Sequence, residues 1–301
     1  MLRKALRPLV PRRFRDALRV RREIRAWEAK LRRPSGDIEP RPHGRKDRVF
    51  VTLTSYRPRF PTLHLTLLTL LQQTVRPDGV LLWISHQDVA KLPRKVKALA
   101  RRGVTICPCD DIRSYKKLIF ALESYPDSIL VTADDDANYP RDWLETLLNG
   151  LDPHEPVILC YRAHRIAFTD GGGIAPYRQW GRDVQDERAR RPSTDIVPTG
   201  VGGVVYPPGC LSKEATDRAT FMRLSPDADD LWFYWMARRA GTRHRKVGGK
   251  FPRSSWPGTQ EQRLYNRNAV SGNDRQVKAL LRVLGFPASV AAGSQRKEAQ
   301  C

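Results

Sequence analysis

Apolar residues along the first half of the chain follow two alternating patterns. Short continuous apolar runs predict buried strands, and longer segments with an apolar residue every three or four positions predict helices. The predicted strands cover residues 48–54, 80–85, 104–107 and 129–131, and the predicted helices cover 63–73, 89–102, 115–124 and a segment after Pro140. Such alternation predicts an α/β fold with a mostly parallel, Rossmann-like sheet that has helices on both faces.

The pattern changes after Asn149. Residues 165–197 form a long polar stretch, and loops of this length are commonly lids or disordered segments. Gly241 is a plausible C-cap for the helix that precedes it. The predicted elements of this half are strands at 157–161 and 201–206 and helices at 229–241 and 275–284.

Three consecutive aspartates, Asp134, Asp135 and Asp136, follow the fourth predicted strand. Two unit charges about 4 Å apart repel by roughly 4 kcal/mol at an effective dielectric near 20, so these carboxylates need water or cations around them. Magnesium and manganese prefer hard oxygen ligands and bind through one or two carboxylates plus substrate phosphates. Because alternate residues of an extended segment point the same way, we expect Asp134 and Asp136 to face one site. A solvated acidic turn that caps the next helix is the alternative.

The position of the three aspartates favours the ligand site. They follow a buried strand and precede Pro140, a residue typical of the first turn of a helix. In open α/β sheets, ligands bind at the carboxyl ends of the strands. A cation site at this edge of the sheet is therefore expected.

Charge is distributed unevenly along the chain. Its 301 residues are 40% apolar, which allows one large α/β domain, and they carry a net charge of +22. Residues 1–48 hold 17 Lys or Arg against 6 Asp or Glu. We therefore divide the chain into a basic arm at 1–47, a folded domain at 48–285 and a tail at 286–301.

The basic arm contains a predicted amphipathic helix. Its apolar stripe consists of Ala17, Val20, Ile24, Trp27 and Leu31, with arginines on other positions. We favour binding of residues 10–33 to an anionic membrane surface, where each basic residue contributes about 1 kcal/mol. A short coiled coil and packing on its own domain are the alternatives. No apolar run approaches the roughly 20 residues that span a bilayer, so we expect a cytoplasmic protein that is at most peripheral on the inner membrane face.

Six segments of the chain resemble, in their order, the landmarks of family 2 glycosyltransferases with the GT-A fold. The resemblance spans about residues 48–245. The landmarks are VTLTSY, LLQQTVRPDGVLLWIS, DDIRSYKKLIFALES, ILVTADDDANYPRDWLETL, GVGGVVYPPGCL and DADDLWFYWMARRAG. Each segment alone is a weak signal, whereas the shared order is specific. The resemblance implies that residues 48–285 are a GT-A catalytic domain.

The resemblance also implies an inverting, metal-dependent transfer of a sugar from a nucleotide-sugar. A Mn²⁺ or Mg²⁺ ion held by Asp134 and Asp136 would neutralise the departing diphosphate. Asp229 and Asp230 stand where the family has Glu-Asp, so Asp230 is the expected general base for the acceptor hydroxyl, with Asp229 beside it. Without the family, helix N-capping would be the preferred interpretation of this pair.

Both substrates receive candidate residues from the same resemblance. Donor contacts are expected from Thr54, Ser55, Tyr56, Asp111, Lys116, Lys117 and Asp135. Thr54 replaces the proline usual in the family, Asp111 would contact the base, and the lysines would meet the diphosphate unless they are ordinary exposed lysines. Acceptor contacts are expected from Gly202, Gly203 and Trp256. A strand bulge explains the two glycines equally well. Tyr177 and Trp180 lie in loops like Trp256 and could also stack on an acceptor sugar, but buried loop anchors are the commoner role for such aromatics.

Two other functions remain open beside the expected one. We expect a UDP-sugar donor and a glycan or lipid-linked acceptor in surface polysaccharide synthesis. The net charge would suit a nucleic-acid-binding protein, but no RNA- or DNA-binding motif is found, so no nucleic-acid partner is expected. A sugar nucleotidyltransferase or a phosphoesterase would be expected to carry a Gly-rich phosphate loop after the first strand, and TSYRPRF contains no glycine.

Overall fold

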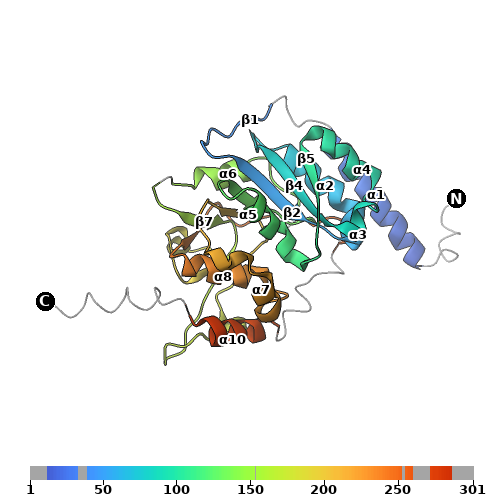
Figure 1. Ribbon diagram of the computed structural model, residues 1–301. Helices are drawn as coiled ribbons and strands as arrows, with labels where there is room; N and C mark the ends of the chain where they lie inside the picture. The colour runs from blue at the N-terminus through green and yellow to red at the C-terminus, as the bar shows by residue number, and fades with distance from the viewer. Residues whose placement is uncertain (1–11, 33–38, 153, 253–254, 260–271, 287–301) are drawn as a thin grey trace, which may run out of the picture.

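A seven-stranded sheet forms the centre of the protein (Figure 1). The computed structural model describes residues 12–32, 39–152, 154–252, 255–259 and 272–286. The strands, in spatial order, are β11 (Arg243–Lys246), β7 (Val157–Cys160), β10 (Val204–Tyr206), β6 (Ile129–Thr132), β2 (Val49–Thr54), β4 (Gly79–Ser85) and β5 (Val104–Cys109). Strand β10 is antiparallel to both of its neighbours, and the other pairs of the sheet are parallel. The predicted fold class is confirmed.

Helices cover both faces of the sheet because its strands bury side chains on both sides. Along β2, Phe50 packs into one buried cluster, whereas Val49, Val51 and Leu53 pack into a second cluster on the opposite face. The helices on the Val51 side are α2 (Phe60–Leu71), α4 (Arg94–Ala98) and α6 (Trp143–Asn149). The helices on the Phe50 side are α5 (Ile119–Ser124), α7 (Arg218–Leu224), α8 (Asp229–Arg239) and α10 (Gly272–Leu284).

Smaller elements complete the described part of the chain. They are helices α1 (Arg12–Arg32) and α3 (His86–Val89), the parallel pair β1 (Arg41–Pro42) and β3 (Val75–Arg76), and the antiparallel pair β8 (Ala163–Arg165) and β9 (Ile196–Pro198). The predicted tail after Phe286 lies outside the described residues, as do residues 1–11 of the predicted arm.

Two predicted helices are divided in the structure. The segment at 89–102 contains the end of α3, then α4, then a 3₁₀ turn at Leu99–Arg102. Pro93 is the N-cap of α4, and because proline has no backbone N–H it interrupts the helical hydrogen bonds of this segment. The segment at 115–124 begins in a 3₁₀ turn, Arg113–Lys117, before α5.

Helix α1 packs on its own domain through the predicted apolar stripe. Trp27 meets the ring of Trp256 edge to face at 5.3 Å between centroids. Glu28 is buried and lies 2.8 Å from Nε2 of His64 in α2 and 2.6 Å from Nζ of Lys95 in α4. This stripe therefore contacts protein, which was the alternative to the favoured membrane interpretation. Among the described residues, no helix is long and apolar enough to cross a membrane.

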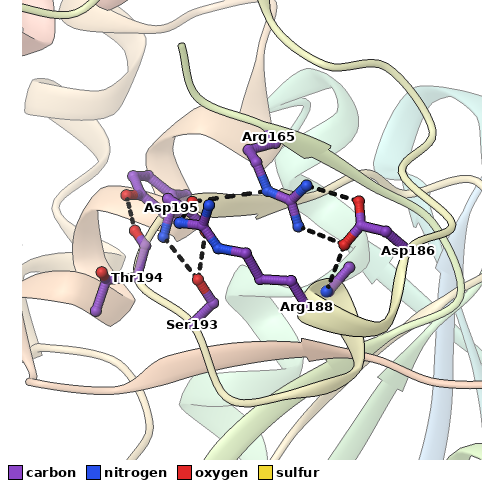
Figure 2. A network of polar contacts seen from close by, with 8 residues as sticks. Arg165, Asp186, Arg188, Ser193, Thr194 and Asp195 are labelled. Carbon is purple, nitrogen blue, oxygen red and sulfur yellow. Dashed lines mark hydrogen bonds and ion pairs between the residues drawn. The ribbon is translucent and has the colours of Figure 1, made fainter. Parts of the chain in front are cut away.

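Charged side chains order the polar stretch at 165–197, which was predicted as a lid or a disordered segment. Figure 2 shows this network. Arg165 donates two hydrogen bonds to Asp186, at 2.6 and 2.9 Å, and Arg188 donates one to buried Asp195 at 2.6 Å. The network holds the loop that leads into β9, and the residues at the end of β9 reach the cavity described next.

Candidate functional site

A cavity of about 760 Å³ lies at the carboxyl edge of the sheet. The end of β2 contributes Thr54, Ser55 and Tyr56 to its wall, and the segment after β6 contributes Ala133, Asp134 and Asp135. The segment after β5 contributes Asp111, Arg113, Ser114, Lys116 and Lys117. Residues 197–201 and 227–231 complete the wall. The cavity therefore brings together the predicted donor-binding residues with Asp229 and Asp230.

The acidic turn after β6 is held in place from several sides. The Ser55 hydroxyl donates to Oδ2 of Asp135 at 2.5 Å, and Nη1 of Arg59 donates to Oδ2 of Asp136 at 2.5 Å. The hydroxyl of Tyr139 accepts a hydrogen bond from the backbone N–H of Asp134 at 2.7 Å. Asp134 and Asp135 line the cavity, while Asp136 pairs with the buried guanidinium of Arg59.

This arrangement differs from the predicted pairing of Asp134 with Asp136. The alternation argument assumed an extended chain through all three aspartates. Strand β6 ends at Thr132, however, and the chain turns at Asp135 and Asp136. A turn removes the two-residue period, so adjacent carboxylates share the cavity wall instead.

Burial leaves the cavity carboxylates short of compensating charge. Burial raises the pKa of Asp134, although the charge of Lys117 partly opposes the shift. Burial raises the pKa of Asp135 to about 7, despite the hydrogen bond from Ser55. Both groups would ionise more readily beside an added cation.

Lys117 is the internal counter-ion of the site. Its side chain is buried, and its Nζ lies 3.0 Å from Oδ2 of Asp229 and 3.7 Å from Oδ1 of Asp134. Burial alone would lower the pKa of Lys117, but the charges of Asp229 and Asp134 outweigh burial and raise it. Lys117 is thus a buried ammonium rather than the exposed lysine that the sequence left open.

Asp229 and Asp230 occupy the first turn of α8, but they do not cap it. The N-cap residue is Ala228, which makes no side-chain capping bond. Oδ1 of Asp229 accepts a hydrogen bond from the Ser114 hydroxyl at 3.0 Å, and Asp229 is buried. Asp230 also lines the cavity, and burial and the charge of Asp229 raise its pKa to about 7. The two carboxylates therefore have different surroundings.

Gly200 was not singled out in the sequence, yet it adjoins three charged side chains of the cavity. Its backbone N–H donates to Oδ2 of Asp230 at 3.1 Å. A Cβ atom at this position would lie 2.9 Å from Nζ of Lys117, 3.3 Å from Oδ1 of Asp134 and 3.6 Å from Oδ1 of Asp230. The absence of a side chain thus keeps one small space open between an ammonium and two carboxylates. The only sequence signal was the glycine-rich segment TGVGG.

Lys116 and Asp111 form an ion pair in the wall of the cavity. Nζ of Lys116 donates to Oδ1 of Asp111 at 2.6 Å. Burial alone would raise the pKa of Asp111, but the hydrogen bond and charge of Lys116 outweigh burial and lower it. Asp111 is therefore a hydrogen-bond acceptor at neutral pH, which suits an N–H group of a nucleobase.

The three predicted acceptor residues do not line the cavity. Gly202 and Gly203 have φ angles of +88° and +91°, and a Cβ atom on them would meet Phe251 and Trp143 at 2.9 and 2.6 Å. Trp256 is 1% exposed, and its Nε1 donates to Oγ1 of Thr66 at 2.7 Å. Backbone conformation and close packing explain all three residues. Tyr177, a loop aromatic for which the sequence left acceptor stacking open, does line the cavity, and the lining residues not assigned to the site from the sequence include Arg162, His164, Thr199 and Asn273.

The donor set of the cavity fits a divalent cation that shares its coordination with a ligand. No group of three or more His, Cys, Asp or Glu side chains in the described part of the chain is arranged to hold a metal by itself. Asp134 and Asp135 nevertheless offer carboxylate oxygens on one wall. Magnesium, and by similar chemistry manganese, binds through one or two carboxylates when phosphate oxygens and water complete the shell.

Comparisons with known proteins give structural likenesses only. No protein-family model matches the chain, and no curated protein matches it significantly in sequence. Mannosyltransferase PcManGT from Pyrobaculum calidifontis, solved with GDP-Man and Mn²⁺, is 17% identical with a TM-score of 0.43, covering 93% of this chain and 84% of its own. A CMP:2-keto-3-deoxy-manno-octonic acid synthetase complexed with CTP is 14% identical with a TM-score of 0.40, covering 75% and 99%. The 4-diphosphocytidyl-2C-methyl-D-erythritol synthase of Anaerococcus prevotii is 14% identical with a TM-score of 0.42, covering 74% and 95%. Likenesses of this strength carry no inference about function.

Proposed function

We propose that the protein is an inverting glycosyltransferase that moves a sugar from a nucleotide-sugar, a UDP-sugar in the first instance, to a hydroxyl group. One observation carries this proposal. Oδ1 of Asp134, Oδ1 of Asp230 and Nζ of Lys117 come together beside Gly200, and all three side chains line one cavity of about 760 Å³. A sugar transfer needs a base for the acceptor hydroxyl and positive charge for the departing diphosphate, and these side chains would supply both to one cavity.

The nucleoside would lie at the end of the cavity formed by β2 and the segment after β5. Asp111 would accept a hydrogen bond from the base, and its lowered pKa keeps it ionised for that role. Ser55 and Tyr56 would position the ribose. Lys116 holds the Asp111 carboxylate in place through the 2.6 Å hydrogen bond. These contacts would direct the diphosphate toward the acidic turn.

Asp134 and Asp135 would hold the divalent cation, either Mn²⁺ or Mg²⁺. The bound cation would supply positive charge to the diphosphate of the donor. The assignment of Asp135 in place of Asp136 follows from the turn after β6, since Asp136 pairs with Arg59. The ammonium of Lys117, 3.7 Å from Oδ1 of Asp134, adds a fixed positive charge to the same region.

Asp230 would act as the general base. The acceptor oxygen attacks the anomeric carbon, its proton passes to Asp230, and the bond from that carbon to the diphosphate oxygen breaks, which inverts the anomeric centre. A pKa of about 7 is close to the working pH, where a general base is most effective. The N–H of Gly200 orients Oδ2 of this carboxylate. Asp229 is a positioning residue, because it holds Lys117 at 3.0 Å.

The acceptor would be a glycan or lipid-linked hydroxyl group in surface polysaccharide synthesis. It would enter past Arg162, Tyr177 and Asn273, which line the same cavity as Asp230 and interact with one another through Tyr177. Tyr177 is near that base, because the charge of Asp230 contributes to raising its pKa after burial, to about 12.

The test is a reaction with purified full-length protein, MnCl₂ and a panel of nucleotide-sugars, with products identified by mass spectrometry. We expect release of the nucleoside diphosphate from one donor, and loss of this release in Asp230→Asn with donor binding retained. Binding would be followed by thermal shift, because a ligand of the folded state raises apparent stability. Formation of a nucleotide-sugar from a nucleoside triphosphate and a sugar phosphate would establish a nucleotidyltransferase instead. The absence of binding to any nucleotide-sugar would also overturn the proposal.

A further inference from the structure

Helix α1 has a second apolar face that its own domain does not cover. Phe14 and Leu18 are 65% and 53% exposed and lie one helical turn apart. Arg21 and Arg25, both exposed, continue the same line along the helix at the following turns. We call these four residues the Phe14 face. It is separate from the stripe of Val20, Ile24, Trp27 and Leu31 that packs on the domain.

The acidic residues of α1 lie away from the Phe14 face. Asp16 and Glu23 are on the opposite side, where they lie 3.5 and 3.8 Å from the guanidinium of Arg19. Glu28 is buried against His64 and Lys95. The Phe14 face therefore combines two exposed apolar side chains with positive charge, and its own helix does not neutralise that charge.

We propose that the Phe14 face docks the protein onto an anionic lipid surface. Interfacial helices place large apolar side chains at the boundary between headgroups and acyl chains while flanking basic residues meet anionic headgroups. Arginine suits this geometry because its aliphatic stem can lie along the apolar layer while the guanidinium stays in the headgroup region. The first turns of α1 extend beyond α3 in Figure 1, and Phe14 and Leu18 on these turns are exposed.

A series of side-chain contacts links helix α1 to the acidic turn after β6. The ring of Trp27 contacts Trp256, Nε1 of Trp256 donates to Oγ1 of Thr66 at 2.7 Å, and this hydroxyl donates to the backbone carbonyl of Asp135 at 2.9 Å. A docked α1 would thus hold the cavity at a fixed position relative to the membrane. This position would place a lipid-linked acceptor near Asp230, so this consequence rests on the proposed function. The docking itself does not depend on that function.

The test is co-sedimentation of the full-length protein with vesicles of phosphatidylcholine alone or mixed with phosphatidylglycerol. We expect binding only to the mixed vesicles, and weaker binding as salt rises. Arg21→Gln/Arg25→Gln should lower vesicle affinity roughly 30-fold, from about 1 kcal/mol per basic residue. Arg101→Gln/Arg102→Gln, which removes the same charge from an exposed turn elsewhere, is the matched control and should change affinity little.

A second pair of variants tests the apolar contribution. Phe14→Ser/Leu18→Ser should weaken vesicle binding, whereas Val283→Ser, at a 44% exposed position of α10, should not. Circular dichroism checks that each variant is folded. Equal weakening by the charge control, no binding to anionic vesicles, or binding of added RNA in preference to vesicles at physiological salt would overturn the proposal. Nucleotide-sugar turnover in solution by a Phe14→Ser/Leu18→Ser variant that no longer binds vesicles would leave the proposed function intact.

Discussion

The ammonium group of Lys117 lies 3.0 Å from Oδ2 of Asp229 in the buried wall of the cavity. Both groups come from segments that the sheet brings together: Lys117 precedes α5, and Asp229 begins α8. A buried carboxylate without a partner is strongly disfavoured, and Lys117 gives Asp229 that partner. The ammonium group of Lys117 also brings positive charge close to Asp134 and Asp230.

Removal of this ammonium should destabilise the fold. Lys117→Met leaves Asp229 and Asp134 without their buried counter-charge, and we expect the free energy of unfolding at pH 7 to fall by about 3 kcal/mol. Urea denaturation followed by circular dichroism measures the change. Lowering the pH should recover part of the loss, because the carboxylates can then be protonated.

Lys116→Met is the matched control for Lys117→Met. Lys116 is also buried, but its partner Asp111 has a side chain that is 51% exposed and can be hydrated instead. The free energy of unfolding should therefore fall by only about 1 kcal/mol. Equal losses in the two variants would contradict the role of Lys117 as the counter-ion of the site.

The pH dependence of turnover should report the Asp230 carboxylate. A base must be deprotonated to act, so kcat/KM should rise with pH around the raised pKa of about 7. Asp229→Asn removes a neighbouring negative charge, which favours the ionised form of Asp230 and should move this rise to lower pH. ¹³C NMR of labelled aspartate carboxyls follows the same titration without substrate. A titration that does not move in Asp229→Asn would assign the pH dependence to another group.

Asp135 should make stability depend on pH in the opposite sense to a salt-bridged aspartate. Its pKa is about 7 in the folded protein and near the ordinary 3.8 in the unfolded chain. Between pH 3.8 and pH 7 the folded state therefore binds more protons than the unfolded chain. The contribution of Asp135 to stability is fully present below pH 3.8 and is lost as the pH rises through about 7. In EDTA, Asp135→Asn should be more stable than the parent protein at pH 8 by about 1–3 kcal/mol, and nearly equal to it at pH 3.

Asp127→Asn provides the reference for that measurement, because Asp127 is exposed in the turn before β6. Its effect on the free energy of unfolding should be small at both pH values. If Asp135→Asn behaved in the same way, the Asp135 carboxyl would not have the perturbed environment described above.

Local sequence patterns predicted the sheet and the strand ends better than the geometry within the site. Strands buried on both faces must be apolar throughout, so β2, β4 and β6 were visible as continuous runs. The direction of a side chain depends on backbone turns, which is why Asp135 rather than Asp136 lines the cavity with Asp134. The partners of a side chain can lie far away in sequence: Gly200 adjoins the side chain of Lys117, and no periodicity of the sequence predicts such a contact.

The space beside Gly200 should not tolerate a methyl group. In Gly200→Ala the new Cβ would stand 2.9 Å from Nζ of Lys117 and 3.3 Å from Oδ1 of Asp134, and the backbone would not be strained, because Gly200 is not among the glycines with positive φ. We expect kcat/KM for the transferase reaction to fall about 100-fold, as reacting groups are displaced by a fraction of an ångström to an ångström. The thermal melting temperature should change much less than activity. Gly171→Ala is the control, since a Cβ there meets no atom within 4 Å. Full activity in Gly200→Ala would show that the reaction does not depend on the exact positions of Lys117 and Asp134.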